Sequence, residues 1–258
     1  MGKEQYYIVH TPEEISGIRR AAQAAAEVRE KLPLLVQPGM STLSIDQLAG
    51  SLIAHTGGRS AFLGYRGYPA QICISVNDEV VHGIGRADRI VQVGDVLSLD
   101  IGVNIGGFIG DNATTFVVGG GKGSPDVERL LVNTEKALME GLQQAKPGNY
   151  IRDISAAIEK VARTARLGVV REYVGHGCGT RLHEPPEIPN FVCAYRGPRL
   201  VPGMVLAIEP MFNLGTHKVF TESDMWTVKT ADGSISAHFE HMVLVTENEP
   251  EILTWLKM

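Results

Sequence analysis

The sequence contains little cysteine, and its cysteines lack the spacing of a disulfide framework or of a structural zinc site. Cys73, Cys178 and Cys193 are an odd, scattered set in 258 residues, without a C-x-x-C pair. Such free thiols are typical of a reducing compartment, so we expect the protein in the cytoplasm. No uninterrupted apolar run approaches the length of a membrane span. The first ten residues lack the apolar core of a signal peptide.

An excess of basic residues is also missing. The formal net charge is −5 and the isoelectric point is near 5.9, so neither nucleic acid nor an anionic membrane is an expected partner. With 44% hydrophobic and 21% charged residues and a mean hydropathy of +0.01, the composition is ordinary for a globular protein. The length fits one large domain, or two small halves that share a core.

Residues 96–118, VLSLDIGVNIGGFIGDNATTFVV, form two β-branched apolar runs around a glycine-containing turn, which predicts a β-hairpin. With Ile105 and Gly106 at the tip, Asp100 and Asp111 would face each other directly, with Cβ atoms about 4.5–5.5 Å apart. Two opposed carboxylates repel, and burying either one unpaired is costly. A cation between them removes both objections. The alternative, that each aspartate ends a strand or caps a turn, would be preferred for a lone aspartate, but the pair favours a metal.

Two pairs of helices are predicted, over residues 11–32 and 44–54 and again over about 124–145 and 150–166. Pro38-Gly39 and Pro147-Gly148 break the chain between the helices of each pair, 109 positions apart. The same separation relates the helical face of Ile45, Ala49 and Leu52 to that of Ile154, Ile158 and Val161.

The strand that ends at Asp100 is related by this separation to a strand that ends at Glu209. We infer a duplicated unit with halves at about 11–118 and 124–255, and therefore a pseudo-two-fold α+β fold. Asp100 and Glu209 would then approach one central cleft from opposite sides.

The second half adds a histidine among glycines and a glutamate inside a strand-like run. His176 stands in GHGCG, where glycines permit close backbone approach, although a glycine-rich surface loop with an incidental histidine is the alternative. Glu240 stands in HFEHMVLV, where an unpartnered charge would be costly. The resulting set suits two hard or borderline divalent ions such as Mn, Fe, Co or Zn, and comprises Asp100, Asp111, His176, Glu209 and Glu240. Two such ions can activate a bridging water and polarise a carbonyl, which is hydrolase chemistry.

The motifs LDIG…GD, GHGxGxxxHExP, AIEPM and FEHMVLVT resemble those of type I methionine aminopeptidases, over roughly residues 11–255. The resemblance implies a single catalytic domain over residues 1–258 with the pita-bread fold, in which two pseudo-two-fold related halves surround a central curved antiparallel sheet with helices outside. It implies a metallo-exopeptidase that removes N-terminal methionine when the second residue is small. The expected partners are peptides or nascent chains, met transiently at the ribosome, and the expected state is a monomer.

The same resemblance implies a role for each site residue. Asp100, Asp111, His176, Glu209 and Glu240 would be the metal ligands, with Asp111 and Glu240 bridging both ions. Glu209 would handle the proton of the attacking water, His183 would steady the tetrahedral intermediate, and His82 would position the substrate near the new amine. Side chains that would receive the methionine are Phe62, Tyr65, Tyr68, Cys73 and Trp226.

Several of these residues also have ordinary structural interpretations. His82 could be a strand-end histidine, Tyr65 and Tyr68 surface turn aromatics, and Trp226 a core residue. Departures from the family pattern affect the shape of the pocket rather than the metal centre, and stand at Phe62, Arg66, Gly85, Ile109, Cys178 and Leu182.

Two other functions fit parts of the pattern. A proline-directed peptidase of the same fold would usually carry a long extra N-terminal domain, and a metal-free binding module would have lost ligands. Cys178, two residues after His176, would point to the same side of an extended segment and could meet oxidants or soft metals there. The alternative for Cys178 is a buried, inert thiol.

Overall fold

The computed structural model describes residues 7–256, so residues 1–6, which belong to the segment examined for a signal peptide, lie outside it. The predicted helix pairs are present with slightly different ends. Thr11 caps the first helix through a capping box and Ser124 caps the third through its side chain, each followed by proline at the first helical position. The α-helices of the described residues are α1 (Pro12–Leu35), α2 (Thr42–His55), α3 (Pro125–Leu142) and α4 (Ile151–Ala165).

The strands form antiparallel sheets, as expected for an α+β protein. One sheet holds β1 (Arg59–Ser60), β2 (Cys73–Val76), β4 (Val96–Ile105) and β5 (Phe108–Val117). A second holds β7 (Gly175–Gly177), β8 (Glu184–Ile188), β9 (Val205–Ile208), β14 (His241–Leu244) and β15 (Glu251–Ile252). Two three-stranded sheets consist of β6 (Gly168–Val169), β10 (Met211–Asn213) and β13 (Ser236–His238), and of β3 (Glu79–Val81), β11 (Val219–Thr221) and β12 (Val228–Thr230).

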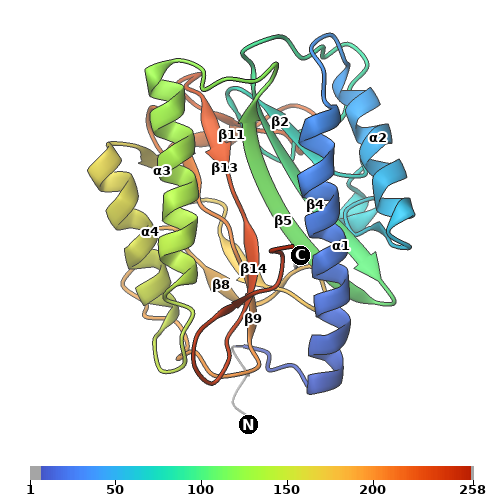
Figure 1. The fold of residues 1–258 in the computed structure, drawn as a ribbon. Helices are drawn as coiled ribbons and strands as arrows, with labels where there is room; N and C mark the ends of the chain where they lie inside the picture. Colours follow the sequence, from blue (N-terminus) through green and yellow to red (C-terminus); the bar gives the residue numbers. More distant parts are fainter. Residues whose placement is uncertain (1–6, 257–258) are drawn as a thin grey trace.

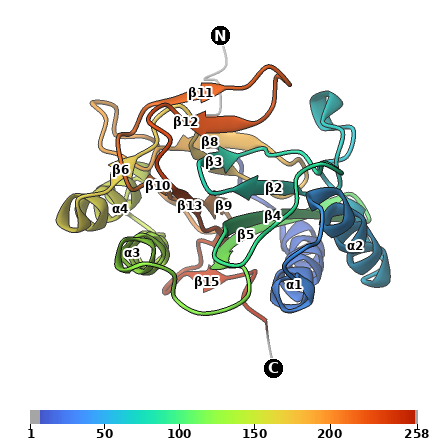
Figure 2. The ribbon, with the colours of Figure 1, turned by 90° about the horizontal axis from the view of Figure 1, so that it is seen from above.

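The helices lie to one side of most of the strands. Figures 1 and 2 show α1 and α2 flanking β4 and β5, and α3 and α4 flanking the region of β9, β10 and β13. The strands β3, β11 and β12 lie on the side away from the helices (Figure 2). A short bridge between Ala113 and Glu240 joins the β4–β5 hairpin to the second half of the chain. Within residues 7–256, no helix combines the length and the apolar character needed to cross a membrane.

The central hairpin forms, but its predicted register is wrong. Ile105 pairs with Phe108, so Gly106 and Gly107 make the two-residue turn. Both glycines have positive φ, 61° and 91°, as a type I′ hairpin turn requires. Asp100 therefore pairs with Ala113 and Asp111 with Gly102, instead of with each other. Because the pairing differs from the predicted one by two residues, an even number, the two aspartates stay on the same face of the hairpin and become diagonal neighbours.

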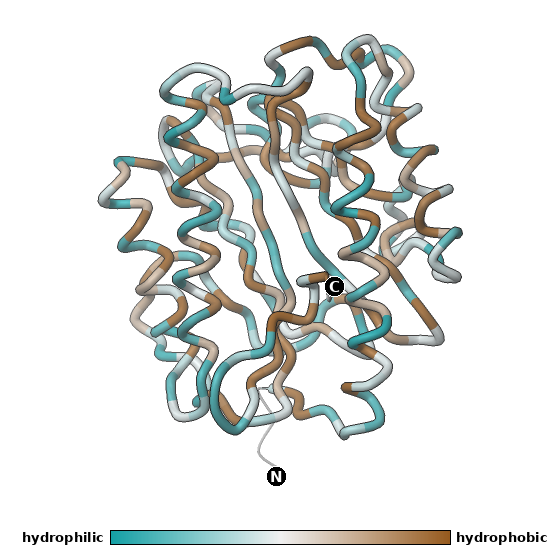
Figure 3. Tube along the Cα trace, in the orientation of Figure 1, coloured by the Kyte–Doolittle hydropathy of each residue, from teal (hydrophilic) through white to brown (hydrophobic). Residues whose placement is uncertain are grey.

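The predicted helical faces pack into the core. Ile45 and Ala49 on α2, and Ile154 and Ile158 on α4, are completely buried. Burial of one such isoleucine side chain contributes about 1.5–3 kcal/mol. The tube in Figure 3 shows apolar segments along the helices and strands that face each other. Helix α1 lies directly on β5, since a Cβ on Gly110 would come within 2.1 Å of the Ala21 carbonyl oxygen. This contact fixes the strand that carries Asp111.

Candidate metal centre

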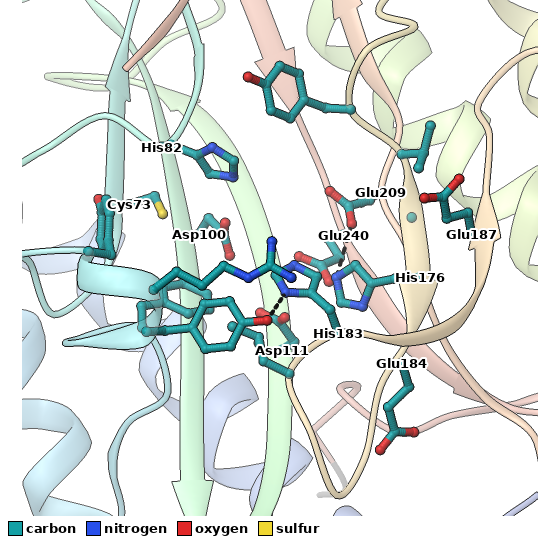
Figure 4. A pocket seen from close by; sticks show the side chains of 18 of the residues that line it. Cys73, His82, Asp100, Asp111, His176, His183, Glu184, Glu187, Glu209 and Glu240 are labelled. Carbon is teal, nitrogen blue, oxygen red and sulfur yellow. Dashed lines mark hydrogen bonds and ion pairs between the residues drawn. The ribbon is translucent and has the colours of Figure 1, made fainter. Parts of the chain in front are cut away.

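All twelve residues predicted for the site line one cavity of about 550 Å³ between the two halves of the chain. Figure 4 shows the side chains of Asp100, Asp111, His176, Glu209 and Glu240 directed toward a common centre, with His82 and His183 at its edge. The hairpin strands β4 and β5 supply Asp100 and Asp111, whereas β7 supplies His176. Residues separated by more than 100 positions thus converge.

Asp111 is held in the middle of β5 and is only 3% exposed. Its backbone N–H donates to the sulfur of Met242 on β14, at 3.0 Å. Asp100 lies in the middle of β4 on the same face. Both aspartates are within strands, so the alternative that they end strands or cap turns does not apply to them.

The glycines around His176 allow the backbone of β7 to pack closely. A Cβ on Gly175 would lie 2.5 Å from the Ala207 carbonyl oxygen, and one on Gly177 would lie 2.5 Å from the Pro185 carbonyl oxygen. The segment is therefore a buried strand and not a surface loop. His176 Nδ1 lies 2.9 Å from the Gly177 carbonyl oxygen and donates its proton there, which leaves the lone pair of Nε2 facing the cavity.

Glu209 and Glu240 occupy irregular positions next to strands. Glu209 follows β9, and its backbone carbonyl accepts a hydrogen bond from the side-chain amide of Asn190 at 3.0 Å. Glu240 lies between β13 and β14, and its backbone exchanges two hydrogen bonds with Ala113 of β5, at 3.0 and 3.3 Å. The bridge between the halves thus sets the position of the Glu240 carboxylate.

Burial disfavours the charged form of each carboxylate in this cluster, and it therefore raises their pKa values. Burial raises the pKa of Asp100 to about 7, opposed by His238 and reinforced by Glu209. Burial raises the pKa values of Asp111 and Glu240 well above their usual range, and neighbouring carboxylates add to the effect. Burial alone raises that of Glu209. Burial also lowers the pKa of His176 to about 3, so its imidazole is neutral at pH 7.

This donor set fits divalent metal ions. Ligand atoms of Asp111, His176 and Glu240 all lie within 4.8 Å of one another. Within residues 7–256, the buried Oδ1 atoms of Asp100 and Asp111 and the Oε1 atom of Glu240 have no hydrogen-bond partner. His176 Nε2, with its lone pair, lies 3.3 Å from Glu209 Oε1. Two electron-rich atoms at that distance are stabilised by a cation that both can coordinate.

His183 and His82 lie beside the cluster in different environments. The Tyr65 hydroxyl and His183 Nδ1 are 2.8 Å apart, and the His183 ring is 4.3 Å from that of His176. His82 has a left-handed backbone with φ of 60° and packs edge-on against Tyr173. Burial lowers the pKa of His82 to about 4. His82 directly follows β3, as its strand-end interpretation describes, and His183 is exposed, but the side chains of both line the cavity.

The predicted side-chain pocket is formed by aromatic residues on one side of the cavity. Tyr68 is buried, donates from its hydroxyl to the Gly83 carbonyl at 2.8 Å, and packs edge-on against Trp226 at 5.1 Å. Phe62 is buried against Gly102 of β4, where a Cβ would meet its ring at 2.3 Å. Cys73 is also buried and lies opposite Asp100 in the β2–β4 ladder. These contacts rule out the surface-turn interpretation for Tyr68.

Two buried histidines that the sequence analysis did not single out support the site. His238 Nε2 lies 3.4 Å from Glu209 Oε2, whereas His176 contacts the other carboxylate oxygen, Oε1. His10 Nε2 lies 3.1 Å from Glu184 Oε2. The Glu184 carboxylate points away from the proposed metal ligands (Figure 4). His238 could have been recognised from the sequence, because it is another polar residue in the strand-like, largely apolar run that contains Glu240.

Cys178 does not line the cavity. It is completely buried, and burial raises its pKa well above the usual value for a thiol. The second interpretation, an inert thiol that acts as a small apolar side chain, therefore describes it.

Comparison with known proteins agrees with the geometry. Residues 16–247 match the model of metallopeptidase family M24. "Methionine aminopeptidase 1" of Bacillus subtilis is 47% identical, over 96% of this chain and 98% of that protein. "Methionine aminopeptidase" of Escherichia coli is 42% identical, over 96% and 94% of the two chains.

Solved structures show the same architecture. The methionine aminopeptidase of Thermotoga maritima superposes with a TM-score of 0.92 at 38% identity, covering 96% of this chain and 99% of that one. The prolidase of Pyrococcus furiosus shares the fold with a TM-score of 0.78 at 21% identity, but this chain covers only 66% of it. The predicted pita-bread fold is confirmed. The chain therefore belongs to metallopeptidase family M24.

Proposed function

We infer that this protein is a metal-dependent aminopeptidase that removes N-terminal methionine from peptides and nascent proteins with a small second residue. The observation that carries this function is a cluster of four buried or half-buried carboxylates and one buried, neutral histidine, open to a cavity with an aromatic, sulfur-containing pocket. Relatives named methionine aminopeptidase, similar over nearly the whole length, support the same reaction.

We propose that Asp100, Asp111, His176, Glu209 and Glu240 hold two divalent ions such as Co, Mn, Fe or Zn, with Asp111 and Glu240 shared between them. Bound ions of this kind lower the pKa of water and polarise a carbonyl group. Glu209 is 12% exposed at its side chain, so its carboxylate can reach the reacting atoms from the edge of the cluster. A carboxylate with a raised pKa can take a proton from water and later pass it to the leaving amine.

His183 would stabilise the negative charge that develops on the scissile carbonyl oxygen. When the Tyr65 hydroxyl donates to Nδ1, the proton of His183 remains on Nε2, where it can be donated into the cavity. His82 is neutral at pH 7 and would hold the substrate near the new amine through a hydrogen bond.

The methionine side chain would enter the pocket of Phe62, Tyr65, Tyr68, Cys73 and Trp226. A thioether packs well on aromatic rings, with a gain of about 0.3–1.5 kcal/mol for each sulfur–aromatic contact. The paired aromatic rings of Tyr68 and Trp226 provide such a surface.

We also propose a duplicated unit and a cytoplasmic setting for this protein. Each proposed half, 11–118 and 124–255, begins with two helices and carries an acidic residue on or after a central strand, which supports a repeated unit in one catalytic domain. The three free cysteines support a reducing cytoplasm, where the substrates would be nascent chains met at the ribosome. A monomer is the proposed state.

A panel of four peptides tests the function. We expect release of the first residue from Met-Ala, little from Met-Leu or Leu-Ala, and none from Ala-Pro, and we expect a chelator to abolish release. Preferential cleavage next to proline would favour the prolidase-like alternative instead. Binding of peptides without cleavage, in the presence of divalent ions, would favour the binding module.

A further inference from the structure

Arg66 brings a positive charge to the mouth of a cavity that is otherwise rich in carboxylates. Among the described residues that line the cavity, Arg66 is the only lysine or arginine. It is exposed, and within residues 7–256 its guanidinium forms no ion pair with a carboxylate. Glu172 and Glu187 also line the cavity, and Glu187 lies on the side away from Cys73 (Figure 4).

The backbone around Arg66 forms a tight turn with several positive φ angles. The short helical turn Tyr65–Gly67 places Arg66 at φ 49°, between Gly64 at 83° and Gly67 at 89°. A left-handed backbone is unfavourable at a residue other than glycine. The guanidinium carbon lies 5.4 Å from the centroid of the Tyr65 ring, within the range of a cation–π contact.

The same tyrosine connects Arg66 to the reacting centre. The Tyr65 hydroxyl lies 2.8 Å from His183 Nδ1, and His183 packs against His176. The guanidinium therefore lies on the His183 side of the cavity. In the proposed function, the peptide residues that follow the scissile bond would lie on this side.

We propose that Arg66 is a specificity-determining residue that favours substrates with an acidic side chain at the third position. The inference rests on the proposed function, in which the first side chain fills the aromatic pocket and the second is small. The third side chain is then the first one long enough to reach the exposed guanidinium. Its carboxylate would supply the ion-pair partner that Arg66 lacks among the described residues.

The test compares three peptides with amidated C-termini, Met-Ala-Glu-Ser, Met-Ala-Gln-Ser and Met-Ala-Lys-Ser, at low salt. For the wild type we expect kcat/KM to fall in the order Glu, Gln, Lys. An exposed pair of opposite charges is worth about 0.2–1 kcal/mol, so the Glu peptide should exceed the Gln peptide by roughly 1.5- to fivefold. About 0.5 M salt should reduce this ratio toward one.

Variants assign the preference to Arg66. We expect Arg66→Gln to lose the Glu-to-Gln ratio and Arg66→Lys to keep part of it. Arg163→Gln, which removes an exposed arginine on α4 with the same change in net charge, should keep the wild-type ratio. An equal rate for the Glu and Gln peptides in the wild type would overturn the proposal, as would a ratio that survives in Arg66→Gln. A preference for the Lys peptide would instead assign the subsite to Glu172 and Glu187. Absence of methionine release from all three peptides would contradict the proposed function itself.

Discussion

His10 and Glu184 form a buried pair, with His10 Nε2 3.1 Å from Glu184 Oε2 and both side chains almost inaccessible to solvent. Glu184 Oε1 accepts further hydrogen bonds from the backbone N–H groups of Thr180 and Arg181 and from the Thr180 hydroxyl, at 2.8–2.9 Å. The loop that carries His183 is thereby fixed to the segment that precedes α1. A residue far from the cavity in sequence thus helps to position a residue of the proposed active site.

His10→Ala should reduce both stability and turnover. Loss of a partner from a buried polar pair costs about 1–3 kcal/mol, because the remaining group stays desolvated. We expect a similar loss in the free energy of unfolding, measured by urea denaturation, and a larger effect on kcat than on KM because His183 becomes less well placed. His55→Ala, at an exposed histidine of α2, is the matched control. Unchanged kcat in a destabilised His10→Ala protein would contradict the positioning role.

The metal-free protein should lose stability as the pH rises, because of Asp100. Its pKa is near 3.9 in an unfolded chain and about 7 in the folded protein. The folded state therefore holds the proton more tightly. Its contribution is fully favourable below about pH 4 and is lost as the pH rises through about 7.

Asp100→Asn removes this titration. We expect the difference in unfolding free energy, variant minus wild type, to increase between pH 5 and pH 8 by on the order of 2–4 kcal/mol in the absence of metal. A difference that does not vary with pH would show that Asp100 does not titrate in this range.

Asp111→Asn and Glu240→Gln should abolish activity without unfolding the protein. Changes to groups that merely support metal ligands cost about 10- to 100-fold, so loss of a ligand shared by two ions should cost more than about 100-fold. In the metal-free state, each variant should be at least as stable as the wild type, since a buried charge has been removed. Glu135→Gln, at an exposed glutamate of α3, is the control. Activity within a few-fold of wild type at saturating metal would rule out the shared-ligand role.

The sequence predicted the helices, the hairpin and the cavity residues because these depend on local signals and on motifs. It did not give the register of the hairpin, because Ile105-Gly106 and Gly106-Gly107 were both plausible turns. Only the second gives two positive φ values at glycines. Both registers place Asp100 and Asp111 on the same face of the hairpin, but in the structure they are diagonal neighbours rather than the directly opposed pair that was predicted.

Other features of the site depend on tertiary contacts that no local pattern encodes. The distance between His10 and Glu184 arises from the docking of the segment before α1 on the second sheet, where the His10 N–H donates to the Gly203 carbonyl. The burial of Cys178 likewise depends on its surroundings in the folded chain, and alternation along an extended segment could not predict it. Arg66 was recognised as a departure from the family pattern, but its position at the mouth of the cavity required the structure.

Tyr65→Phe should lower turnover modestly. The substitution removes the hydroxyl that contacts His183 Nδ1 but keeps the ring of the proposed pocket. One hydrogen bond contributes about 0.5–1.5 kcal/mol, so we expect kcat to fall roughly two- to tenfold with a smaller change in KM. His183→Ala should lower kcat by about 100- to 1,000-fold, as expected for loss of a donor to a developing oxyanion. Equal effects of the two variants on kcat would contradict this assignment of roles.

The most direct test is a titration of the metal-free chain with Mn²⁺, in which bound ions per chain and methionine release from Met-Ala-Ser are measured on the same samples. We expect no release from the metal-free chain, and release that increases as ions bind, up to two per chain. Asp111→Asn should neither bind the full complement nor recover activity. If the metal-free wild type releases methionine as fast as the reloaded enzyme, the cluster of Asp100, Asp111, His176, Glu209 and Glu240 is not a catalytic metal centre.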